Sequence, residues 1–400
     1  MTQGAIVPFR VAVDQAALDD LRDRLARTRW PDQLPDAGWD YGTEQGYLRE
    51  LCDYWRAGFD WRQAEARLNG FPQFLTEIDG QLLHFYHVRS PEPDALPLLL
   101  LHGWPGSVAE FLDVLGPLSD PRAHGGDPAH AFHIVAPSLP GFGFSGPTRR
   151  RGYGPEAMGE AFAALMARLG YRRYGIQGGD WGAVIATLMG SQAADHLLGI
   201  HLTLMMGSLM TVPPDPSEPM RGLTEKEQAD VRDSLAFRAR ESGYQAIQAT
   251  KPQTAGTALN DSPAGLAGWI VEKFRAWSDC DGDVERSYTK DQLLTNIALY
   301  SLTGTINSSL RIYYEFTGFG QAVRLLGADG TPAPVVRVPT AHARYPREVV
   351  RPPRSWTLKQ YPNMVRWTEM PRGGHFAAME EPASFTADVR AFFGDLRRPG

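Results

Sequence analysis

The chain has 400 residues, of which 43% are hydrophobic and 22% charged, and its formal net charge is −6. This composition is typical of a globular enzyme, and the negative charge argues against nucleic acid or an anionic membrane surface as a partner. No apolar stretch approaches the ~20 residues of a membrane span, and the first residues carry no signal-peptide pattern. Cys52 and Cys280 are too few for a disulfide framework or a zinc cluster, so we expect a cytoplasmic protein without a metal site.

Residues 1–92 are expected to form an N-terminal region that wraps the rest of the protein. Helices with one apolar face and an extended, aromatic-rich meander suit this role. The expected elements are a strand or extended arm at 9–13, a helix after the candidate N-cap Asp14, and helices at 46–59 and 64–68. Two runs of β-forming residues on either side of Asp79 and Gly80, at 74–78 and 82–88, then predict a hairpin.

Residues 93–210 alternate apolar strands with helices, as expected for the first part of an α/β core. The predicted strands are 97–101, 131–137 and 174–177, and the predicted helices are 155–169 and 184–189. Such alternation favours a mostly parallel central sheet with helices on both faces.

The turn Gly178-Gly179-Asp180-Trp181-Gly182 has the pattern of a nucleophile elbow, a strained strand-to-helix turn that exposes one reactive side chain. Small residues on both sides of that side chain let the backbone pass close to itself. The exposed residue is Asp180, where the common hydrolase motif has Ser. We therefore predict a carboxylate nucleophile that forms an ester with the substrate.

Residues 211–325 break the alternating pattern. A Pro-rich link at 213–219 leads into helical pieces, among them 224–241, 264–278 and 290–301, which we interpret as a helical cap over the site. Residues 326–400 resume the core pattern as its second part. The elements expected there are strands at 333–340 and 363–370 and a closing helix at 382–396.

His375 is the predicted base. It follows the last strand and two glycines, downstream of the elbow, which is where this architecture keeps its catalytic histidine. An aspartate is already ionised at neutral pH, so the histidine would instead activate the water that hydrolyses the ester. An acid between the elbow and His375 should hold it; Glu348 is the first candidate and Asp329 the second, whereas Glu380 and Glu381 follow the histidine.

Two backbone N–H groups are expected to stabilise the negative charge that develops on the ester oxygen. Trp181 follows the nucleophile directly and supplies one of them. Trp104, in the turn His102-Gly103-Trp104-Pro105, supplies the other.

Together these motifs resemble the microsomal-type epoxide hydrolases of the α/β-hydrolase fold, over nearly the whole chain. The resemblance rests on the order of the following motifs: His102-Gly103-Trp104-Pro105-Gly106, the elbow, Glu241-Ser242-Gly243-Tyr244, Asn260-Asp261-Ser262-Pro263, Arg311-Ile312-Tyr313, Tyr345-Pro346-Arg347-Glu348 and Arg372-Gly373-Gly374-His375-Phe376. It implies that two cap tyrosines, Tyr244 and Tyr313, hold the epoxide oxygen and donate a proton as the ring opens. It also supports Glu348 as the acid, and the Arg-x-Tyr pattern favours Tyr313 over the adjacent Tyr314. Membrane-bound relatives carry an N-terminal anchor that is not seen here.

The expected activity is therefore the opening of an epoxide to a vicinal diol through an ester on Asp180, without a metal or an organic cofactor. The aromatic residues near the motifs suggest an apolar or aryl epoxide, and the Ala-, Arg-, Gly- and Pro-rich composition suits a bacterial enzyme of biosynthesis or detoxification. We allow for a homodimer. A haloalkane dehalogenase and a non-catalytic hydrolase-fold binding protein are the alternatives, and a serine esterase is disfavoured because no Gly-x-Ser-x-Gly motif occurs.

Overall fold

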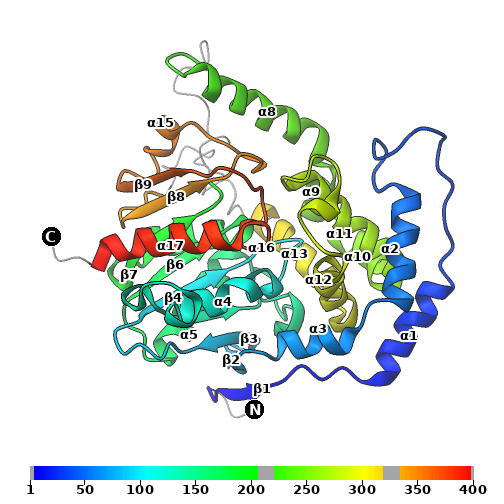
Figure 1. Cartoon of the computed structure of the whole chain (residues 1–400), viewed down its shortest axis with the longest axis horizontal. Helices are drawn as coiled ribbons and strands as arrows, with labels where there is room; N and C mark the ends of the chain where they lie inside the picture. The colour runs from blue at the N-terminus through cyan, green and yellow to red at the C-terminus, as the bar shows by residue number, and fades with distance from the viewer. Residues whose placement is uncertain (1–3, 206–219, 319–333, 398–400) are drawn as a thin grey trace.

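A single mixed sheet runs through the centre of the protein (Figure 1). The computed structural model describes residues 4–205, 220–318 and 334–397, and within them the sheet has nine strands in the order β1-β2-β3-β5-β4-β6-β7-β8-β9. Neighbours from β1 to β5 pair antiparallel and those from β5 to β9 pair parallel. The strands are β1 (Val7–Phe9), β2 (Gln73–Ile78), β3 (Gln81–Val88), β4 (Leu96–Leu101), β5 (Phe132–Pro137), β6 (Tyr174–Gly178), β7 (Leu197–Leu202), β8 (Thr340–Arg344) and β9 (Met364–Glu369).

Helices cover both faces of the parallel half of the sheet. In β7, a Cβ at Gly199 would meet side chains of α17 (Pro382–Arg397), while the side chain of the next residue, Ile200, lies next to α6 (Asp180–Gln192). Successive side chains of a strand point to opposite faces, so α17 and α6 lie on opposite faces. Helix α5 (Pro155–Arg168) packs beside α6, and α4 (Leu112–Ser119) and α16 (Ala377–Glu380) pack beside α17. The predicted mostly parallel sheet with helices on both faces is confirmed.

The N-terminal region reaches from one edge of the sheet to the helical side of the molecule. Strand β1 pairs with β2 at the sheet edge. The helices α1 (Gln15–Ala26), α2 (Gln45–Ala57) and α3 (Trp61–Leu68) instead contact α11 (Pro263–Trp277) and α12 (Lys290–Thr303) (Figure 1). The predicted hairpin is confirmed as β2 and β3. Asp14 stands at the predicted N-cap position of α1, but its side chain makes no capping hydrogen bond.

A run of helices follows β7 and precedes β8. They are α8 (Glu225–Glu241), α9 (Gly243–Thr250), α10 (Pro252–Asp261), α11 (Pro263–Trp277), α12 (Lys290–Thr303) and α13 (Ile306–Gly318). In Figure 1, α8 lies apart, above β8 and β9, while α10, α11 and α12 lie towards the N-terminal helices and α13 lies nearer the sheet. Capping boxes begin α8 and α12, at Thr224 with Glu227 and at Thr289 with Gln292. Within the described residues, no helix is both long and apolar enough to cross a membrane.

Two predicted strands lie in the wrong place. The strand expected at 333–340 is instead β8. Pro334 and Pro339 lack the backbone N–H that strand pairing needs. The true strand contains the buried polar residues His342 and Arg344, which hide the apolar pattern of a strand. The strand or extended arm expected at 9–13 corresponds to β1, which lies closer to the N-terminus. The strand does not continue to Val11, because the N–H of Val11 donates a hydrogen bond to the Asn69 side chain instead of to a neighbouring strand. Strand β7 was not among the expected elements. The predicted link at 213–219, Asp329 and the region boundaries near 210 and 325 lie outside the described residues.

Candidate active site

Asp180 lies at the turn between β6 and α6. Its φ is +45°, a left-handed conformation that is strained for a residue with a side chain. A Cβ at Gly178 would collide with the backbone of Gly182, and a Cβ at Gly182 would collide with the backbone of Leu101. Only small residues fit on either side of Asp180, so the turn has the strained geometry of the predicted elbow.

The turn after β4 presses against the Asp180 carboxylate. The N–H of Trp104 donates a hydrogen bond to Asp180 Oδ1 at 2.7 Å. A Cβ at Gly103 would collide with that same oxygen, which explains why glycine stands there. Of the two predicted oxyanion donors, Trp104 is therefore directed at the carboxylate, whereas no hydrogen bond joins the N–H of Trp181 to it among the described residues.

The loop after β9 brings His375 between two carboxylates. His375 Nδ1 lies 2.7 Å from Glu348 Oε1, and Nε2 lies 3.3 Å from Asp180 Oδ2. His375 and Glu348 are 5% and 1% exposed, so little water separates the three groups. The structure thus brings together the three residues that the sequence analysis selected from distant parts of the chain.

The two carboxylates control the charge of the histidine. Burial by itself would lower the pKa of His375, but the negative charge of Glu348 and the nearby Asp180 outweigh it and raise that pKa well above its ordinary value. This environment therefore favours the protonated imidazole over the neutral one.

Tyr244 of α9 and Tyr313 of α13 lie next to each other on the helical side of the site. Their ring centroids are 5.8 Å apart; Trp104 stacks on Tyr244 at 5.2 Å, and Trp181 meets Tyr313 edge-on at 4.7 Å. Burial raises the pKa of both tyrosine hydroxyls, so they stay protonated. Tyr314 is 43% exposed and points away, so the structure places Tyr313 rather than its neighbour at the site.

Comparison with known proteins agrees with this geometry. Residues 6–111 match the family model described as epoxide hydrolase N terminus, and residues 97–264 match that of the alpha/beta hydrolase fold. Epoxide hydrolase 1 of Sus scrofa is 40% identical over 98% of this chain and 90% of its own. The crystal structure of juvenile hormone epoxide hydrolase from the silkworm Bombyx mori matches 98% of this chain and 95% of its own, with a TM-score of 0.89 and 32% identity. The epoxide hydrolase of Aspergillus niger matches 98% and 97%, with a TM-score of 0.85 and 32% identity.

The chain belongs to the microsomal epoxide hydrolase family. It is an epoxide hydrolase of the α/β-hydrolase fold. This membership decides against the haloalkane dehalogenase that the sequence left as an alternative.

The epoxide hydrolase has a cavity that opens towards α8 and α9, here named the outer cavity. Asp180 and His375 lie at its base, and Tyr244 lies in its wall. Apolar side chains and polar groups of α8 and α9 also line it: Leu204, Ser234, Leu235, Phe237, Arg238, Glu241, Ser242, Gln245, Trp277, Val349 and Val350. An uncharged, apolar molecule would fit this wall better than an ionised one.

The His375 loop of the hydrolase is held by a residue that the sequence analysis set aside. The carboxylate of Glu380 accepts hydrogen bonds from the N–H groups of Gly374 and Phe376, on either side of His375, and from that of Asp279, each at 2.9 Å. Glu380 is not the acid partner of the histidine, as predicted, but it fixes the loop that carries it. The sequence signal for this role is a Glu in the first turn of the helix that follows the histidine.

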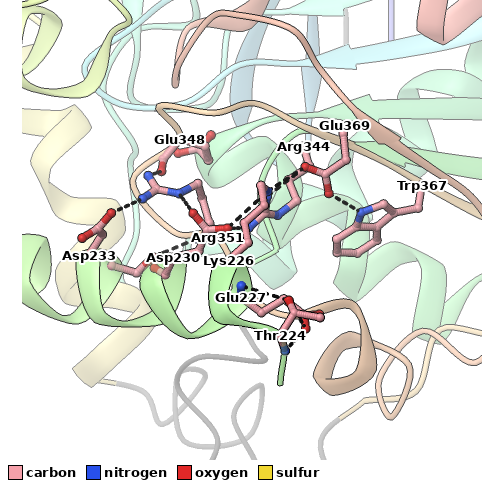
Figure 2. Close-up of polar contacts among 11 residues, drawn as sticks. Thr224, Lys226, Glu227, Asp230, Asp233, Arg344, Glu348, Arg351, Trp367 and Glu369 are labelled. Atoms are coloured by element: carbon pink, nitrogen blue, oxygen red, sulfur yellow. Dashed lines mark hydrogen bonds and ion pairs between the residues drawn. The ribbon is translucent and has the colours of Figure 1, made fainter. Parts of the chain in front are cut away.

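Ion pairs connect α8 of the hydrolase to the segment that carries Glu348 (Figure 2). Asp230 of α8 lies between two arginines: its Oδ2 is 2.5 Å from Arg344 Nη2 and its Oδ1 is 3.1 Å from Arg351 Nε. Arg351 in turn donates a hydrogen bond to the backbone oxygen of Glu348 at 2.9 Å. Because Arg344 is buried, Asp230 compensates a charge that water cannot reach. Among the described residues, no group of three or more His, Cys, Asp or Glu side chains is placed to hold a metal ion.

Proposed function

We propose that this epoxide hydrolase opens an apolar or aryl epoxide to a vicinal diol in two steps, with Asp180 as the nucleophile. The observation that carries the proposal is the position of Asp180, between the His375–Glu348 pair on the core side and the Tyr244–Tyr313 pair on the helical side. The first pair supplies a base, and the second supplies protonated hydroxyls. Helices α8 to α13 would act as the cap that closes the site.

In the first step, Asp180 attacks an epoxide carbon and the carbon–oxygen bond of the ring breaks. Tyr244 and Tyr313 hydrogen-bond the epoxide oxygen, and one of them gives it a proton. Their buried hydroxyls remain protonated, which is the form that a proton donor needs. The product is a hydroxyalkyl ester on Asp180.

Ester formation prepares the second step electrostatically. The ester carries no charge, so one of the two carboxylates that raise the pKa of His375 is lost. His375 then gives up its proton more readily, and this proton restores the hydroxyl of the tyrosine that protonated the epoxide oxygen. Held by Glu348, the neutral imidazole can accept a proton from water. The hydroxide attacks the ester carbonyl carbon, the N–H of Trp104 stabilises the oxyanion, and the diol leaves. We include the N–H of Trp181 as the second donor, since a tetrahedral intermediate places its oxygen differently from the free carboxylate.

The substrate class follows from the outer cavity. Several side chains that line this cavity together with Asp180 offer the apolar surface that an alkyl or aryl substituent requires. They are Leu204, Leu235, Phe237, Val349 and Val350. The polar residues of α8 and α9 would lie near the mouth of the cavity, where a diol product leaves.

The proposal is tested with the His375→Gln variant and styrene oxide. Intact-mass spectrometry and peptide mapping should show one substrate mass attached to the peptide that contains Asp180, because the ester forms but is not hydrolysed. The Asp180→Ala variant is the control and should show neither adduct nor turnover. An adduct on another peptide, or turnover by Asp180→Ala, would contradict the mechanism.

A further inference from the structure

A second cavity, here named the inner cavity, lies against Asp180 on the core side. It is lined by the ends of β4, β6 and β7, by the turn with Trp104 and by the 3-10 helix η1 (Val108–Phe111). Of the described residues, Asp180 and His375 are the two that line both cavities. The reacting carboxylate and the base thus form the partition between a largely apolar cavity that opens outwards and a cavity within the core.

The inner cavity has the size and the chemistry of a water site. It measures about 20 Å³, which exceeds the roughly 10–15 Å³ that one ordered water needs. Gln177 is 1% exposed, and its Oε1 has no hydrogen-bond partner among the described residues. The Nε2 of His375 faces Asp180 Oδ2 at 3.3 Å, and Thr203 and Glu110 add a hydroxyl and a carboxyl group to the lining. A buried amide oxygen without a partner is costly, and a bound water removes that cost.

We propose that the inner cavity holds the water that hydrolyses the ester, bound by Glu110 and Gln177 beside His375 and Asp180. This inference rests on the two-step function proposed above. Once the ester has formed, the outer cavity holds the alkyl group of the substrate. Water from the inner cavity reaches the ester carbonyl carbon without passing that group.

Glu110 is held in place by the fold of its own turn. Ser107 caps η1 through its side chain, and a Cβ at Gly106 would collide with Glu110 Oε1, so the carboxyl group packs directly on that glycine. Burial raises the pKa of Glu110 to about 8. The carboxyl group is therefore mostly neutral at pH 7 and accepts a hydrogen bond without placing a second negative charge beside Asp180.

The proton and electron balance of the step is complete. One O–H bond of the water breaks and its proton passes to Nε2 of His375, while the oxygen forms a bond to Cγ of Asp180. The other O–H of the water points to Gln177 Oε1 or to Glu110. The bond between Cγ of Asp180 and the oxygen of the alkyl group then breaks, and the departing alkoxide takes the proton from His375. The carboxylic acid left at Asp180 passes its proton to His375, which restores the carboxylate.

The test compares ester formation with ester hydrolysis in Glu110→Leu and Gln177→Leu. Rapid-quench samples with styrene oxide, read by intact mass, give both rates. We expect hydrolysis to slow by about 10- to 100-fold, with the rate of ester formation unchanged, so that the esterified enzyme accumulates. Glu110→Gln keeps an acceptor oxygen and should recover most of the rate.

Asp113→Asn is the matched control, since Asp113 lies three residues beyond Glu110 but pairs with Arg67 at the surface. It should behave like the wild type. Thermal melts verify that each variant is folded. If a leucine variant does not fold, the two rates are measured in the single variants Glu110→Gln and Gln177→Glu instead. Hydrolysis at the wild-type rate in all folded variants, or equal slowing of both steps, would overturn the inference. In that case an Asp180 ester in His375→Gln would still support the proposed function, whereas its absence would remove both.

Discussion

The two sides of the active site hold their side chains by different forces. On the core side, Asp180 and His375 are placed by a strained turn, by glycines with no room for a Cβ, and by polar contacts of 2.7 to 3.3 Å. On the helical side, Tyr244 and Tyr313 are placed by ring contacts with centroids 4.7 to 5.8 Å apart. Directional hydrogen bonds to charged groups define position sharply, whereas aromatic packing tolerates small shifts.

This difference indicates how precisely each side must position its groups for the proposed reaction. In the proposed mechanism a bond forms at one carboxylate oxygen, so the core side has to be exact, and its residues come from tight turns. The epoxide oxygen needs only a hydroxyl within reach, so the helical side can adapt to different substituents. We therefore expect substitutions on the core side to reduce the rate most, those on the helical side to reduce it less, and those at the junction to act mainly on stability.

The largest effect is expected from Gly103→Ala on the core side. The new Cβ collides with Asp180 Oδ1 and displaces both the nucleophile and the Trp104 donor. We expect kcat/KM for styrene oxide to fall by about 10³-fold. Gly243→Ala is the control, because a Cβ at the start of α9 meets open space. Retention of more than a tenth of the activity by Gly103→Ala would show that the core side is less exact than its contacts suggest.

A smaller effect is expected from Tyr244→Phe and Tyr313→Phe on the helical side. Each change removes one hydroxyl but keeps the ring packing, so ester formation should slow by about 10- to 100-fold while ester hydrolysis keeps its rate. Single-turnover measurements separate the two steps. Tyr314→Phe is the control, since that ring is exposed. Slower hydrolysis in either variant would mean that the tyrosines also act in the second step.

The smallest effect on rate is expected at the junction, from Asp230→Asn on α8. The change leaves buried Arg344 without its closest compensating charge, and it weakens the contact through Arg351 to the Glu348 segment (Figure 2). Urea unfolding should show a loss of about 2 kcal/mol. Asp233→Asn is the control, because Asp233 pairs with the same Arg351 but is 69% exposed, and it should cost less than about 0.5 kcal/mol. Equal losses of stability in the two variants would show that the ion pairs of Asp230 stabilise the protein no more than the exposed ion pair of Asp233.

Short-range patterns were enough to predict much of the fold and the site. The hairpin at β2 and β3 follows from its turn residues, and the elbow follows from small residues around one reactive side chain. His375 and Glu348 follow from their positions after strands, and the structure brings them together with Asp180. These features depend on residues that are neighbours in the chain, whose turn geometry and order can be read directly.

Contacts between distant segments needed the tertiary structure. β8 escaped prediction because His342 and Arg344 make it look polar, although Nδ1 of His342 bonds the backbone oxygen of Leu202 and Arg344 forms ion pairs with Asp230 and Glu369. Glu110 was not among the residues selected from the sequence, and Glu380 was set aside because it follows the histidine. The fold places one at the inner cavity and the other against the backbone of the histidine loop. The sequence by itself determined which groups are proposed to react, because that proposal depends on the side chain and its turn. The tertiary structure decided which groups hold them, because burial and hydrogen-bond partners arise only when distant segments meet.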